Sequence, residues 1–147
     1  MRLVYFPPLG DAYFFVNQVK GLPSISSAQE LTKRYITSCI LLSWVAMEVA
    51  ASHRAKELQA RGLLHTTPSR QLIHSIELLL SVNQRTLDVQ SYRRLRKVRN
   101  DIAHPRADDK DDTPPIGVAV ETFEFCATVI QDLYHPTTLI YRLVESG

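Results

Sequence analysis

Cysteine and glycine are scarce in this sequence, and their scarcity excludes several classes of protein. The two cysteines, Cys39 and Cys126, lie far apart in apolar segments, which favours buried thiols in a reducing compartment over a disulfide framework. The 5 glycines and 8 prolines form no linker-like or low-complexity tract. With 147 residues, 45% of them hydrophobic and 22% charged, the composition is that of an ordinary globular protein. We therefore expect a single domain over residues 1–147.

Charge of one sign and long hydrophobic runs are also lacking. The formal net charge of +2 is too small to indicate nucleic-acid binding by itself. The longest apolar stretch, residues 36–51, is interrupted by polar residues and is shorter than the roughly 20 residues that span a bilayer. The first 15 residues contain Pro7, Pro8 and Asp11, unlike the apolar core of a signal peptide. These features predict a cytoplasmic protein with no membrane partner.

Motifs of metal and nucleotide sites are missing as well. The sequence has no CxxC, HExxH or GxxxxGK[ST] pattern, and its histidines lack the close paired spacing of metal ligands. We therefore predict neither a metal nor a cofactor.

Apolar residues recur at three- and four-residue spacing along most of the chain, and no stretch alternates as a strand would. The predicted helices cover residues 11–21, 27–62, 68–83, 88–104, 114–134 and 136–144. Their boundaries follow from a capping box at Ser27 and Glu30, a first-turn proline at Pro68, and Pro105, which ends the preceding helix. In the second predicted helix, the expected core stripe is Leu31, Tyr35, Cys39, Leu42, Ala46 and Val49.

The predicted fold class is all-α. We expect a bundle of four main helices with short flanking ones. Residues 1–25 form an N-terminal extension in this prediction, and residues 105–115 form an acidic loop.

One segment carries candidate chemistry, namely Arg99-Asn100-Asp101-Ile102-Ala103-His104. It closes a predicted helix whose apolar stripe is already supplied by Tyr92, Leu95, Val98 and Ile102. The core therefore does not require Arg99, Asn100 or His104, and the four-residue spacing of Asn100 and His104 places these two on one side of the helix.

In this setting the segment RNDIAHP resembles the motif of the HEPN superfamily, helical domains found in prokaryotic toxins, abortive-infection proteins and other RNA-cutting systems. The resemblance extends over about residues 27–145 in helix order, but only RNDIAH is residue-specific. It implies a metal-independent endoribonuclease of toxin–antitoxin or antiviral defence type. Arg99 and His104 would be catalytic, with Asn100 as a polar helper.

The resemblance also implies partners. Two chains would pair so that both motifs line one cleft, and a neutralising antitoxin or a defence-system partner is possible. Some HEPN toxins carry a tyrosine two positions after the histidine, which a partner nucleotidyltransferase modifies. Here that position is Arg106, which argues against control by that route.

The chemistry of RNA cleavage fits these residue types. Without a metal, the reaction needs a base for the 2′-hydroxyl, an acid for the leaving 5′-oxygen, and positive charge on the transition state. His104 can act as acid or base, since imidazole titrates near neutrality. Arg99 has a fork of donors that suits phosphate oxygens. The expected product carries a 2′,3′-cyclic phosphate.

Charged neighbours suggest further roles. Seven basic residues lie between positions 85 and 106 with only two acidic ones, and they could follow an RNA backbone or form an ordinary solvated face. The candidates for RNA binding are Arg93, Arg94, Arg96, Lys97 and Arg106.

Glu48 lies in an apolar part of the second predicted helix, where it either pairs structurally with an arginine or orients the site. Asp101 is a second supporting candidate.

Two other functions stay open at this point. One is a noncatalytic HEPN-type module that binds RNA or nucleotides, and the other is a helical interaction domain in which RNDIAH is structural. A second chain that brings its own His104 within reach would favour the enzyme. An isolated Arg99 with a structural partner would favour the interaction domain.

Overall fold

The computed structural model describes residues 7–21, 26–64, 71–104 and 113–134, and its regular elements in these ranges are five helices. They are α1 (Pro7–Lys20), α2 (Ser26–Ala60), α3 (Leu72–Val82), α4 (Val89–Ala103) and α5 (Ile116–Leu133). Within these residues there is no strand. The predicted all-α class is confirmed.

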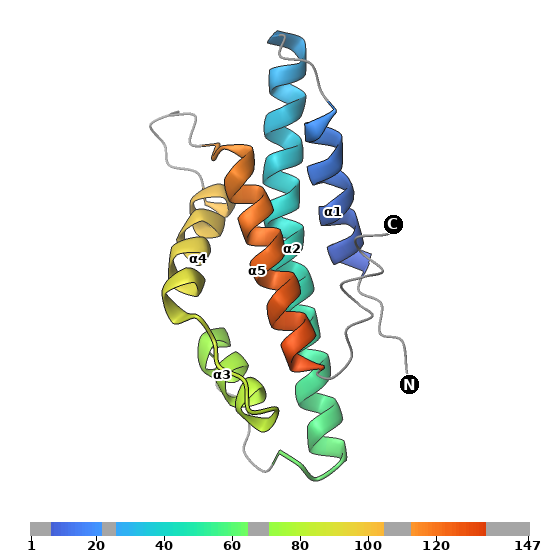
Figure 1. Cartoon of the computed structure of the whole chain (residues 1–147), viewed down its shortest axis with the longest axis vertical. Helices are drawn as coiled ribbons and strands as arrows, with labels where there is room; N and C mark the ends of the chain where they lie inside the picture. Colours follow the sequence, from blue (N-terminus) through green and yellow to red (C-terminus); the bar gives the residue numbers. More distant parts are fainter. Residues whose placement is uncertain (1–6, 22–25, 65–70, 105–112, 135–147) are drawn as a thin grey trace.

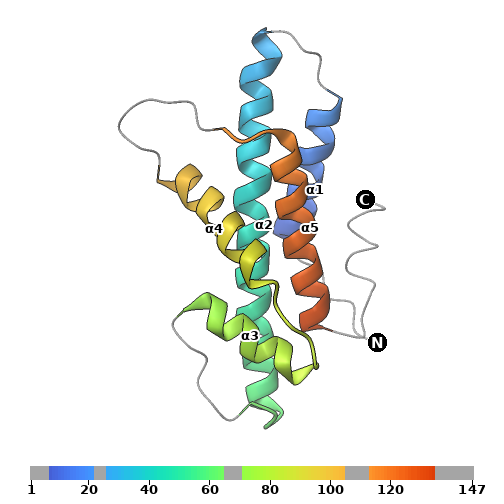
Figure 2. The ribbon, with the colours of Figure 1, turned by 60° about the vertical axis from the view of Figure 1, so that its left-hand side comes forward.

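The long helix α2 is the support on which the others pack (Figure 1). Its 35 residues extend over roughly 50 Å at 1.5 Å per residue. Helices α1 and α5 lie against one side of it, and α1 also contacts α5. Helices α3 and α4 follow each other along another side, and α4 crosses α2 obliquely (Figure 2).

Helix ends follow local signals in most cases. Asp88 caps α4 by accepting a hydrogen bond from the Ser91 amide at 3.1 Å, and α4 ends at Ala103 with His104 as its C-cap, as predicted. Helix α2 stops at Ala60, shortly before Gly62, whose φ of 71° lies in the left-handed region that glycine tolerates.

Other boundaries differ from the prediction. Helix α1 begins at Pro7 instead of near Asp11. Helix α3 begins at Leu72 with Gln71 in an extended conformation before it, later than the proline signal at Pro68 suggests. Pro68, most of the acidic loop and the predicted helix 136–144 lie outside the described residues, as does the side chain of Ser27 in the predicted capping box.

The core is built from all five helices. Its fully buried members include Leu9 and Ala12 of α1, Ile40, Trp44 and Met47 of α2, Ile76 and Leu79 of α3, Tyr92 and Leu95 of α4, and Cys126 and Ile130 of α5. Helix α1 supplies buried side chains along its length, so the described part of the predicted N-terminal extension belongs to the packed domain.

The predicted core stripe of α2 is partly wrong. Cys39 and Ala46 are buried, but Leu31 is 38% exposed and Val49 is 48% exposed. Helices cover α2 from more than one side, so its buried arc is wide and includes Ser43, whose hydroxyl donates to the carbonyl of Cys39 at 2.7 Å. Leu31 and Val49 lie at the edge of this arc.

Helix α2 is also the one described segment with the length and composition of a membrane span. The residues concerned are Gln29–Ala60, and half of the most apolar window is buried inside the structure. A core helix of a soluble protein has the same properties, so the structure is compatible with a soluble protein.

Candidate functional site

Helix α4 carries the predicted motif in its last turns and is anchored to the core at its other end. Tyr92 and Leu95 are buried, whereas Val98 and Ile102 are half-buried and pack against the edge of the core. The predicted apolar stripe of this helix is therefore confirmed for its first half. Fewer residues of α4 are buried toward its C-terminal turn, where the motif lies.

Two side chains of α2 hold Arg99. Its Nη2 atom lies 3.4 Å from Oε1 of Glu48, and its guanidinium carbon lies 5.7 Å from the centre of the Trp44 ring. The Arg99 side chain is 25% exposed, and its Nε atom is buried without a hydrogen-bond partner among the described residues. Arg99 is thus placed by an ion pair and a cation–π contact, both with the same helix.

Glu48 is less buried than its apolar sequence neighbours suggest. Its side chain is 44% exposed, at the edge of the covered part of α2. The prediction that it needs a partner holds, since Arg99 is that partner. Within the described part of the chain, Oε1 is the one carboxylate oxygen of Glu48 that accepts a hydrogen bond.

His104 lies at the very end of α4. Its backbone amide donates to the carbonyl of Asn100 at 2.9 Å, and its side chain is exposed, with no hydrogen bond or ion pair to the described residues. Asn100 is half-buried. The structure therefore does not bring His104 into contact with Arg99 within one chain.

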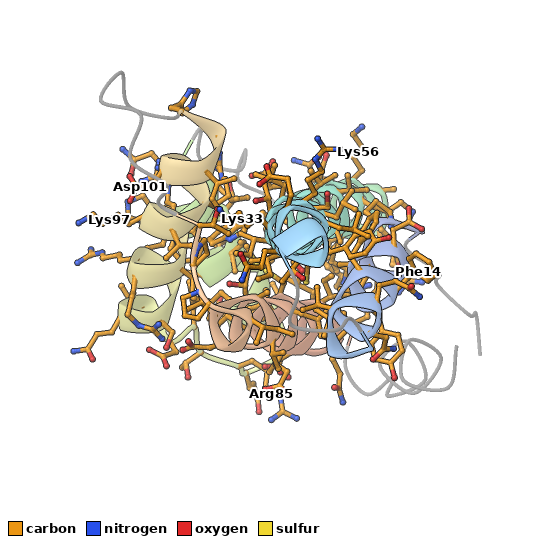
Figure 3. The ribbon with its side chains drawn as sticks, turned by 90° about the horizontal axis from the view of Figure 1, so that it is seen from above. Phe14, Lys33, Lys56, Arg85, Lys97 and Asp101 are labelled. Carbon is orange, nitrogen blue, oxygen red and sulfur yellow. The ribbon has the colours of Figure 1, made fainter. Side chains whose placement is uncertain are left out.

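The outer side of α4 carries Lys97 and Asp101. Figure 3 shows both side chains pointing away from α2, and both are exposed. Asp101 therefore does not lie beside the Arg99–Glu48 pair. The supporting role predicted for Asp101 stays a prediction.

The basic residues of α4 do not share one face. Arg94 makes a bidentate ion pair with Glu121 of α5, with one hydrogen bond at 3.1 Å, and this pairing lowers the pKa of Glu121. Arg96 faces the other way, beside Arg99, and Arg93 is exposed. Arg106 lies outside the described residues. Arg93, Arg96 and Lys97 are all exposed and, at 3.6 residues per turn, lie within an arc of about 100° that excludes Arg94 and Arg99. Their role in RNA binding stays a prediction.

A pocket of about 540 Å³ opens between α2, the start of α3 and α4. Its walls are formed by Glu48, Gln71, Leu72, Ile73, Tyr92, Arg96 and Arg99. This size lies within the range of about 300–1,000 Å³ that small-molecule sites have. Sequence reasoning missed the pocket, because the approach of α3 to the motif has no local signal.

The remaining reactive groups are engaged in packing. Burial raises the pKa of the Cys39 thiol to about 12 and that of Cys126 well above its ordinary value, as expected for inert core thiols. His53 shares a hydrogen bond of 2.7 Å with the hydroxyl of Tyr134, whose pKa burial raises to about 12. Across the described ranges, no three His, Cys, Asp or Glu side chains gather as metal ligands would.

Comparisons with protein family models, with curated proteins and with solved structures found no match for this chain.

Proposed function

We propose that the chain is a metal-independent endoribonuclease of the HEPN type, in which Arg99 and His104 are catalytic and Asn100 assists. The observation that supports this proposal most is the placement of Arg99. Glu48 and Trp44 hold it beside an open pocket, at the end of the helix from which His104 projects into solvent. This arrangement keeps a phosphate-binding cation and a titratable group on neighbouring turns.

Arg99 can bind a phosphate while Glu48 holds it. A guanidinium has five N–H donors, and Glu48 accepts from one nitrogen of Arg99. The others can donate to the oxygens of a phosphodiester, where they stabilise the charge that develops in the transition state.

The proton transfers need two titratable groups. One His104 takes the proton of the 2′-hydroxyl, whose oxygen attacks the phosphorus, and the bond to the 5′-oxygen breaks. A second His104 donates a proton to that leaving oxygen. The products are a 2′,3′-cyclic phosphate and a 5′-hydroxyl, and the two histidines come from two chains.

An exposed apolar surface supports such a homodimer. Val45 and Val49 are 42% and 48% exposed on α2, one turn apart, on either side of Glu48 in the sequence. A second copy that covers these residues would lie next to the pocket, in the two-fold geometry usual for dimers. The proposal also includes a cytoplasmic location and a neutralising antitoxin or defence-system partner.

The contact of Arg99 also favours a second candidate function. An arginine with a carboxylate partner in its own chain is what a purely structural role requires. In that case the chain is a helical interaction domain, and RNDIAH secures α4 to α2. The two candidates differ in the role of His104, which makes no structural contact through its side chain.

The test is an RNase assay of the wild type beside His104→Ala, with His74→Ala as the matched control. His74 is an exposed histidine of α3, away from the motif. We expect His104→Ala to lose about 10²- to 10⁴-fold in rate and His74→Ala to lose nothing. A folded His104→Ala protein with wild-type activity contradicts the enzyme, and a wild type without activity favours the interaction domain.

A further inference from the structure

The pocket beside Arg99 has a use apart from the proton transfers, because His104 does not line it. We propose that it binds one nucleotide of the RNA and prefers guanine, so that it selects the cut site. This inference rests on the proposed function in taking RNA as the ligand. Besides Arg99, it concerns residues of α2, α3 and α4 that lie outside the RNDIAH motif.

The charges in the pocket favour an anionic ligand. Arg96 and Arg99 lie three positions apart on α4 and both face the pocket, while Glu48 is its single carboxylate. The net charge of the lining is therefore positive. Two guanidinium groups on successive turns suit the two phosphates that flank one nucleotide of an RNA chain.

The opposite wall is apolar. Leu72 and Ile73 of α3 are half-buried and pack against the core, and each also lines the pocket. Sequence-specific proteins read single-stranded RNA by enclosing an unstacked base between such walls and contacting its edge. A volume of about 540 Å³ can hold one nucleotide.

Glu48 decides which base fits. An ionised carboxylate only accepts hydrogen bonds, and one of the two oxygens of Glu48 has no donor among the described residues. The pairing edge of guanine offers two adjacent donors, N1–H and the N2 amino group. The edge of uracil offers one donor between two acceptors, which a carboxylate would repel.

The sole tryptophan of the chain supplies the measurement. Trp44 lies 5.7 Å from the guanidinium of Arg99 and 5.2 Å from the ring of Tyr92, and both of these residues line the pocket. Fluorescence of Trp44 in the full-length His104→Ala chain is titrated with GMP and with UMP, so that binding is measured without cleavage. We expect saturable binding of GMP, at least fivefold tighter than that of UMP.

Variants test each wall. Arg96→Ala should weaken GMP binding at least fivefold, whereas Lys56→Ala, which removes an exposed cation of α2 outside the pocket, should leave it unchanged. Glu48→Gln should bring the GMP and UMP affinities close together.

Equal affinities for GMP and UMP in the parent chain would overturn the inference. So would a GMP affinity that Arg96→Ala leaves unaltered. RNA cleavage without nucleotide binding refutes the pocket and leaves the enzyme standing. Selective GMP binding without RNA cleavage supports the pocket and refutes the enzyme.

Discussion

Replacing Arg99 by alanine should lower both stability and activity, whereas replacing His104 should lower activity alone. Arg99→Ala removes an ion pair at 3.4 Å between side chains that are 25% and 44% exposed. Such partly exposed pairs contribute about 0.2–1 kcal/mol. It also removes the contact with Trp44 at 5.7 Å, which contributes about 0.5–1 kcal/mol.

The two losses add to about 0.7–2 kcal/mol. A loss of that size lowers the Tm of a chain of this length by about 2–8 °C. The side chain of His104 is exposed and makes no hydrogen bond or ion pair with the described residues, and alanine keeps the backbone hydrogen bond to Asn100. His104→Ala should therefore change stability by less than about 0.5 kcal/mol.

Thermal unfolding followed by circular dichroism measures the stabilities, and initial rates on a labelled RNA measure the activities. A double-mutant cycle of Arg99→Ala with Glu48→Gln should give a coupling energy of about 0.5–1 kcal/mol in the stability data. An unchanged Tm for Arg99→Ala would refute the anchoring of this residue by α2. A His104→Ala protein as unstable as Arg99→Ala would refute the separation of the two roles.

Three further predictions concern the reaction, the core and the assembly. Cleavage should survive EDTA and leave 2′,3′-cyclic phosphate ends; loss of activity that a divalent ion restores would contradict this. Burial raises the pKa of Cys39 and of Tyr134, each to about 12, so both stay protonated in the fold while the unfolded chain ionises. The free energy of unfolding measured with urea should therefore fall as the pH rises from about 9 to 12. The fall should be less steep in Cys39→Ala, and a stability that does not change with pH would refute this prediction. Mixing Arg99→Ala with His104→Ala chains should restore part of the cleavage, because one mixed pair keeps one intact copy of each residue; a fully active monomer in sedimentation would exclude the shared site.

Local signals predicted most of the helices. Asp88 and the proline after His104 mark the ends of α4, and the boundaries there agree with the structure. The side of α2 that is buried was predicted less well. Periodicity finds an apolar stripe, but the width of the buried arc depends on how many helices pack on α2. Leu31 and Val49 lie on parts of α2 that the described helices leave uncovered.

The sequence predicted which residues belong to the candidate site, but it did not predict how these residues are arranged in space. Arg99 and Glu48 lie 51 positions apart, and no spacing rule links them. Trp44 is buried in the core, but its contact with Arg99 depends on how α4 crosses α2. Ile73 is half-buried at the wall of the pocket. Such placements follow from tertiary packing.

The strength of the Arg99–Glu48 contact decides whether Arg99 is available to a substrate. A partly exposed pair of this kind contributes about 0.2–1 kcal/mol, whereas a hydrogen bond to a charged group contributes about 1.5–3 kcal/mol. A phosphate that enters the pocket can therefore replace Glu48 as an acceptor at small cost, or share the guanidinium with it. Arg99 lines the pocket, which leaves room for that exchange. The ion pair is thus strong enough to orient Arg99 and too weak to withhold it from a phosphate ligand.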